Sequence, residues 1–111
     1  MTINEILEKL SVLDVKKKRS QEENYLELVF FKKDINAWER ELKEIMGQAK
    51  KPFRVKPSAE HGKLAKPYGG IRANQALYQK SFHAYDVIAM IWPWGNGQNM
   101  TLKLAVMDNA T

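Results

Sequence analysis

The sequence predicts an α+β fold, a two-layer sandwich in which an antiparallel sheet of three to five strands carries two helices on one face. Three observations lead to this fold class. Residues 82–107 have the pattern of a long apolar β-hairpin, residues 25–31 alternate as one further strand, and two stretches, 3–13 and 35–46, carry apolar residues at helical spacing. A chain of 111 residues is close to the commonest domain size, so we expect residues 1–111 to form a single domain.

The composition is that of an ordinary globular protein, with 44% hydrophobic and 28% charged residues. No apolar run approaches the roughly 20 residues of a membrane-spanning helix, and the first ten residues carry acids where a secretory signal needs positive charge. We therefore expect a cytoplasmic protein with no membrane partner. The absence of cysteine excludes disulfides and thiolate metal sites.

The hairpin is predicted by Asn96-Gly97, a pair typical of the two-residue type I′ turn, which needs positive φ at both positions. Side chains alternate between the two faces of a strand. A slip of one residue would therefore move the whole apolar set to the other face, so burial determines the register. A turn at Asn96-Gly97 sets three apolar pairs opposite one another: Ile91 with Leu102, Ala89 with Leu104, and Val87 with Val106.

The second face of the hairpin is too apolar for an ordinary solvated face and too mixed for a plain core. It carries Ile88, Met90 and Trp92 opposite Ala105, Lys103 and Thr101. An exposed apolar face of this kind is typical of a protein interface. One expectation for Ile88, Met90 and Trp92 is therefore contact with a protein partner or with a second copy of the chain.

The first helix begins at a predicted capping box formed by Thr2 and Glu5, and its apolar face is Ile3, Ile6, Leu7, Leu10 and Leu13. Residues 16–23 follow as a polar linker that starts with four consecutive bases, either a solvated connection or a phosphate-contacting arm. Tyr25 to Phe31 is the first strand.

The second helix is expected from Ile35 to Met46, with Asp34 as its N-cap and Gly47 at its C-terminal end. Opposite charges four residues apart on its exposed face are expected to stabilise the helix. Its apolar stripe is Ile35, Trp38, Leu42, Ile45 and Met46.

The segment Lys50–Lys80 is strongly basic, with eight Lys or Arg residues and one acid, a local charge of +7 against +5 for the whole chain. Its prolines and glycines predict a long irregular loop up to residue 70, within which residues 53–56 are a candidate very short strand. Residues 71–80 fit either a helix or a strand, and we favour a strand because the hairpin strand beside it is apolar on both faces. A long irregular loop in a small domain is usually functional or disordered.

The sequence carries no catalytic signature, so we expect a binding protein more than an enzyme. His83 and Asp86 are three residues apart in a strand and therefore point to opposite faces, which argues against a general-base pair. No His-x-His or Glu-x-x-His spacing is present for a metal ion. Neither a cofactor nor a metal is predicted.

Basic residues interleaved with aromatic ones are typical of single-stranded nucleic-acid binding, because cations neutralise phosphates and rings stack on bases. We therefore expect a non-catalytic binding module for single-stranded nucleic acid or another polyanion. A protein-interaction or homodimeric module is the alternative. The candidate anion-binding residues are Lys50, Lys51, Arg54, Lys56, Lys63, Lys66, Tyr68, Arg72 and Trp94.

Overall fold

The structure is a computed structural model that describes residues 2–108. One antiparallel five-stranded sheet, in the order β1-β2-β5-β4-β3, forms its centre. The predicted α+β class is therefore confirmed. The elements are α1 (Ile3–Leu10), β1 (Lys17–Gln21), β2 (Tyr25–Phe31), the 3-10 turn η1 (Lys32–Asp34), α2 (Ile35–Met46), α3 (Ala59–Ala65), the 3-10 turn η2 (Lys66–Tyr68), β3 (Ala76–Ser81), β4 (Tyr85–Pro93) and β5 (Asn99–Asp108).

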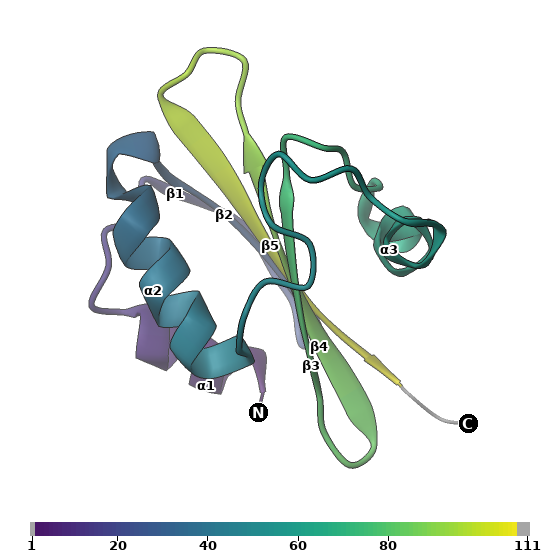
Figure 1. The fold of residues 1–111 in the computed structure, drawn as a ribbon. Helices are drawn as coiled ribbons and strands as arrows, with labels where there is room; N and C mark the ends of the chain where they lie inside the picture. The colour runs from purple at the N-terminus through teal and green to yellow at the C-terminus, as the bar shows by residue number, and fades with distance from the viewer. Residues whose placement is uncertain (1, 109–111) are drawn as a thin grey trace.

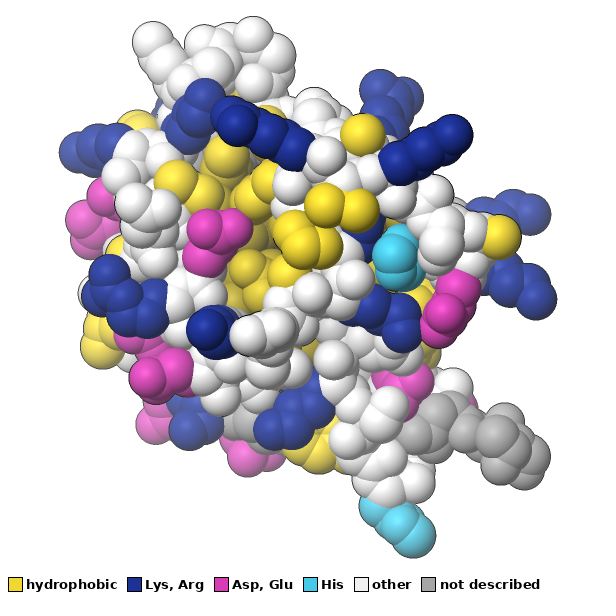
Figure 2. Space-filling model, in the orientation of Figure 1, with side chains coloured by type: hydrophobic (Ala, Val, Ile, Leu, Met, Phe, Trp, Pro, Cys, Tyr) yellow, Lys and Arg dark blue, Asp and Glu magenta, His cyan; other side chains and the backbone are white. Residues whose placement is uncertain are grey.

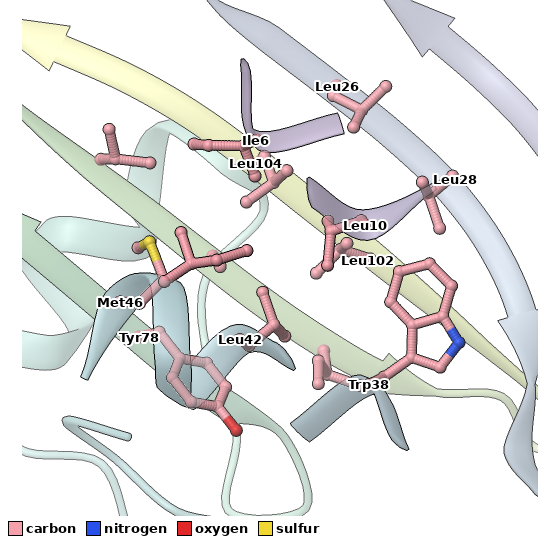
Figure 3. Packing of buried hydrophobic residues seen from close by; sticks show 14 of the residues in the cluster. Ile6, Leu10, Leu26, Leu28, Trp38, Leu42, Met46, Tyr78, Leu102 and Leu104 are labelled. Atoms are coloured by element: carbon pink, nitrogen blue, oxygen red, sulfur yellow. The ribbon is translucent and has the colours of Figure 1, made fainter. Parts of the chain in front are cut away.

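The sheet has helices on both faces (Figure 1). Helices α1 and α2 cover one face, as predicted, and the short helix α3 lies against the other. The main core lies on the α1–α2 side, where Trp38 of α2 stacks on Phe30 of β2 with ring centroids 4.5 Å apart. Figure 3 shows residues of both helices and of three strands meeting there: Ile6, Leu10, Leu26, Leu28, Trp38, Leu42, Met46, Tyr78, Leu102 and Leu104.

The predicted start of α1 is confirmed, because Thr2 Oγ1 accepts from the Glu5 N–H and Glu5 Oε1 accepts from the Thr2 N–H, both at 3.1 Å. Helix α2 has the predicted bounds, and Gly47 follows it with φ +84°. The prediction that the Asp34 side chain caps α2 is wrong. The chain enters α2 through η1, and Asp34 lies outside the extended conformation from which an N-cap oxygen reaches the first helical N–H groups.

The predicted hairpin register is confirmed, with Ile91 paired with Leu102 and Ala89 with Leu104. The predicted two-residue turn is wrong, because the strands are joined by the five residues 94–98. Gly97 has positive φ but Asn96 does not. Instead, Asn96 Oδ1 accepts from the backbone N–H groups two and three residues on, the local bonding that asparagine offers in turns. The Trp94 N–H donates to the Asn99 carbonyl at 2.9 Å, which continues the predicted pairing into the loop.

The polar linker prediction for residues 16–23 is wrong over Lys17–Gln21, which forms edge strand β1 beside β2. Lys17 pairs with Val29 and Gln21 with Leu26, with a register shift between Lys18 and Ser20. The strand is mostly exposed, so it lacks the alternation of apolar and polar residues that marks a half-buried strand. Charged, bulged edge strands are also how proteins avoid pairing with other sheets.

The segment between α2 and β3 contains helix α3 and turn η2, where an irregular loop was predicted. Ser58 and His61 form a capping box for α3, an N-terminal signal that the sequence analysis missed. The short strand considered at residues 53–56 is absent, and Lys51 instead forms an isolated bridge with Leu77. The strand interpretation of residues 71–80 is correct from Ala76 onward.

The α3 segment covers the second face of the hairpin. Ile88 and Met90 are fully buried beneath Ala65, and Trp92 is half-buried. The prediction that Ile88, Met90 and Trp92 form an open apolar face for a partner is therefore wrong. The same chain covers their apolar surface, because the α3 segment, predicted to be an irregular loop, packs against it.

Candidate anion-binding surface

Lys51 lies inside the protein and not on its surface. Its side chain is fully buried, and Nζ donates to the carbonyl oxygens of Pro52 (2.8 Å), Ala73 (3.1 Å) and Gln75. Burial lowers the pKa of this ammonium group. Lys51 therefore ties together the two ends of the segment between α2 and β3, and its prediction as a ligand-binding residue is wrong.

Lys50, the neighbouring residue, is exposed but already has an acidic partner. Its Nζ lies 3.0 Å from Oε1 of Glu60 on α3, the one acid in the basic segment. The hydrogen bond from Lys50 lowers the pKa of the Glu60 carboxyl. Part of the Lys50 charge is thus neutralised within the chain, and we leave it out of the candidate surface.

Tyr68 is half-buried and takes part in the docking of the α3 segment. Its ring stacks on Tyr25 of β2 with centroids 5.9 Å apart and planes 8° apart, and its carbonyl oxygen accepts from Lys103 Nζ at 2.9 Å. One face of the ring is therefore already covered, and Tyr68 has a structural explanation that needs no ligand.

Five further basic residues lie between Lys51 and the start of β3. All five are exposed, and none of them forms an ion pair with an acid of the described residues. The N–H of Arg54 donates to the Ala73 carbonyl at 2.7 Å, which brings Arg54 beside the backbone that follows Arg72. Figure 2 shows Lys and Arg side chains along the upper and right-hand rim of this face. We name the exposed set the loop bases: Arg54, Lys56, Lys63, Lys66 and Arg72.

Trp94 lies on the hairpin tip, residues 94–98, and its side chain is 38% exposed. Its indole Nε1 donates to Thr101 Oγ1 at 2.7 Å, so the ring is held against β5 and does not move freely. A partly exposed, fixed ring of this kind can stack on a ligand at low entropic cost. Trp94 is therefore exposed enough at the tip to contact a ligand.

A second basic and aromatic group, which the sequence analysis missed, lies beside the tip. The Nζ atoms of Lys16 and Lys33 lie 5.3 and 5.5 Å from the ring centroid of Phe31. Such cation–π contacts are worth about 0.5–1 kcal/mol at exposed sites, so the lysines can leave the ring at small cost. A hollow of about 650 Å³ is lined here by Phe31, Lys32, Lys33, Gly97 and Gln98. We name Lys16, Phe31, Lys32 and Lys33 the Phe31 cluster.

The junction between the α3 segment and the sheet is held by Gly69, Trp92 and Lys103. Lys103 Nζ lies 3.5 Å from the Trp92 ring centroid, and burial lowers the pKa of this ammonium group. Gly69 has φ +104°, and a Cβ atom added there would lie 2.5 Å from Cη2 of Trp92. Only glycine fits this position, because both the conformation and the close approach exclude a side chain.

Gly69→Ala is therefore expected to lower the free energy of unfolding by about 1–3 kcal/mol through backbone strain and overpacking. Urea denaturation monitored by circular dichroism measures it. Gly62→Ala is the matched control, since nothing lies within 4 Å of its added Cβ and its φ is ordinary. It should be neutral or stabilising because alanine favours a helix. Equal effects of the two substitutions would contradict the proposed junction.

On the face of the sheet that α1 and α2 cover, away from α3, burial also shifts pKa values. On the α2 side, burial raises the pKa of Tyr78 to about 12, and it also raises the pKa of Glu39. Both residues line a hollow of about 450 Å³ beside Arg40 and Lys43. Within residues 2–108 no three His, Asp or Glu side chains gather where they could hold a metal ion.

Comparison with known protein families, curated proteins and solved structures finds no match for this chain. None of the described helices is both long and apolar enough to cross a membrane. The function is therefore argued from the exposed surface alone.

Proposed function

We propose that this protein is a non-catalytic module that binds a polyanion, with single-stranded nucleic acid as the ligand class, through the loop bases and Trp94. The observation that carries the proposal is the charge of the loop bases. All five are exposed, and none has an acidic partner among residues 2–108.

Like charges gathered on one surface repel one another, and their repulsion opposes the compact state. A polyanion that spans the cluster relieves the repulsion and releases its own condensed counterions, which makes its binding favourable at low salt. The ring of Trp94 adds a surface on which a base can stack. Exposed cations and a fixed, partly exposed ring are together the features with which proteins bind a flexible nucleic-acid strand.

Fluorescence anisotropy with labelled single-stranded and duplex oligonucleotides, at several salt concentrations, tests the proposal. Single strands are expected to bind, and log K should fall with log salt by about 0.7 for each phosphate contact. Arg54→Gln and Lys66→Gln should each weaken binding without regard to base sequence and reduce that slope.

Lys9→Gln is the matched control, because Lys9 is an exposed lysine of α1 on the other side of the sheet and loses the same charge. It should leave the affinity and the salt slope almost unchanged. No binding at tens of micromolar protein in low salt, or equal losses in Lys9→Gln and the loop variants, would refute the proposal.

A further inference from the structure

We infer that the binding surface continues across the hairpin tip onto the Phe31 cluster, where the Phe31 ring stacks on one base of the single strand. The inference rests on the proposed function, but it concerns residues outside the loop bases. It starts from a juxtaposition that the fold creates. Residues 31–33 and residues 97–98 are far apart in the sequence and line one hollow, and Lys16 Nζ lies 5.3 Å from the Phe31 ring centroid.

Backbone and side-chain bonds hold this hollow in shape. The Lys32 N–H donates to the Gln98 carbonyl at 2.8 Å, which joins the end of β2 to the hairpin tip. Lys16 Nζ donates to Oδ1 of Asn99, a residue that is only 4% exposed, at 3.1 Å. Hydrogen bonds to the hairpin tip and to β5 therefore hold Lys32 and Lys16 at the end of the sheet.

The residues around the hollow suit a nucleotide. The half-buried ring of Phe31 gives a base an apolar surface, and the exposed ammonium groups of Lys32 and Lys33 lie where a phosphate would be neutralised. Asp34 is the acid nearest in sequence, and its Oδ2 atom is buried. No ion pair within residues 2–108 involves the three lysines of the cluster. Their charge is available to an anion.

The position of the tip connects the two basic groups. In Figure 1 the tip stands at the same end of the molecule as the start of α2 and the upper turn of the segment between α2 and β3. In Figure 2, Lys and Arg side chains lie on both sides of the projecting tip. A strand that crosses the tip can therefore contact the loop bases, Trp94 and the Phe31 cluster in turn.

The two aromatic rings along this path, Trp94 and Phe31, favour a single strand. Rings stack on unpaired bases, whereas duplex bases are already stacked and paired inside the helix. Phe31 and Trp94 can each take one base only from an unpaired strand. A duplex would keep the phosphate contacts and lose the stacking, so it should bind more weakly at the same salt concentration.

The test compares variants of the cluster, using labelled oligothymidine and a duplex of the same length. Phe31→Leu should weaken oligothymidine binding about 5- to 150-fold, the equivalent of one lost base stack, and leave duplex binding unchanged. The double variant Lys32→Gln with Lys33→Gln should reduce the log–log salt slope by about 1.4. Both lysines are exposed, so this variant tests the inference even if Phe31→Leu is unstable.

Phe82 and Lys80 supply the matched control, because Lys80 Nζ lies 5.6 Å from the Phe82 ring centroid at the β3–β4 turn. Phe82→Leu and Lys80→Gln should change neither affinity nor slope. If the loop variants weaken binding and the cluster variants do not, the inference is wrong and the proposed function stands. An equal loss of oligothymidine and duplex binding in Phe31→Leu also overturns it. If nothing binds, both fail.

Discussion

Replacing Leu104 with alanine is expected to lower the free energy of unfolding by about 2–5 kcal/mol, the range for a fully buried leucine. Leu104 lies on the central strand β5, is 0% exposed, and pairs with Leu26 on one side and Ala89 on the other. Helix α1 covers it from above, with Ile6 close by in Figure 3. Little of the cavity can close, because the site has a neighbour in each direction.

Urea denaturation of the two proteins, followed by circular dichroism, measures this loss. Val12→Ala is the control, since the Val12 side chain is 76% exposed and its removal exposes or buries little apolar surface. We expect its effect to stay within about 0.5 kcal/mol, as for ordinary surface substitutions. A loss from Leu104→Ala no larger than that from Val12→Ala would contradict the register of β5 and its place in the core.

Lys51→Met is expected to lower the free energy of unfolding by about 2–4 kcal/mol, although methionine keeps most of the aliphatic chain. The substitution removes the Lys51 donor from the carbonyl oxygens of Pro52 and Gln75, and the bond to Gln75 is buried. The Ala73 carbonyl loses the same donor but keeps the N–H of Arg54. Buried polar groups that lose a partner cost about 1–3 kcal/mol each, and the three carbonyls share one donor.

Lys50→Met is the matched control, because it changes the same residue type one position earlier in the chain. Lys50 is exposed, and its ion pair with Glu60 is at the surface, so we expect little change in stability. Thermal and urea denaturation of both variants give the comparison. Equal costs, or a larger cost at Lys50, would show that Lys51 does not hold the segment between α2 and β3 in place.

The candidate site was only partly predictable, and the two adjacent lysines show why. Nothing in the local sequence distinguishes Lys50 from Lys51. Their difference arises from the carbonyls of Ala73 and Gln75, more than 20 residues away, which surround the Lys51 ammonium group. The sequence therefore identified a basic segment and could not tell its structural lysine from its exposed ones.

The Phe31 cluster escaped the sequence analysis for a related reason. Lys16 and Phe31 are separated by β1 and most of β2, and Gly97 and Gln98 come from the opposite end of the chain. Antiparallel pairing of β2 with both β1 and β5 brings them together. Convergence of this kind leaves no pattern along the chain that spacing rules could detect.

The sequence by itself determined the elements whose signals are local. The bounds of β2 and α2, the capping box of α1 and the register of the β4–β5 hairpin follow from periodicity and from burial of one apolar face.

Only the tertiary structure decided the position of β1 and the packing of α3 over Ile88 and Met90. It also decided which basic residues are buried and which are exposed. An edge strand takes its backbone hydrogen bonds from a neighbour and needs no apolar pattern of its own. A seven-residue helix gains most of its stability from packing rather than from its own sequence.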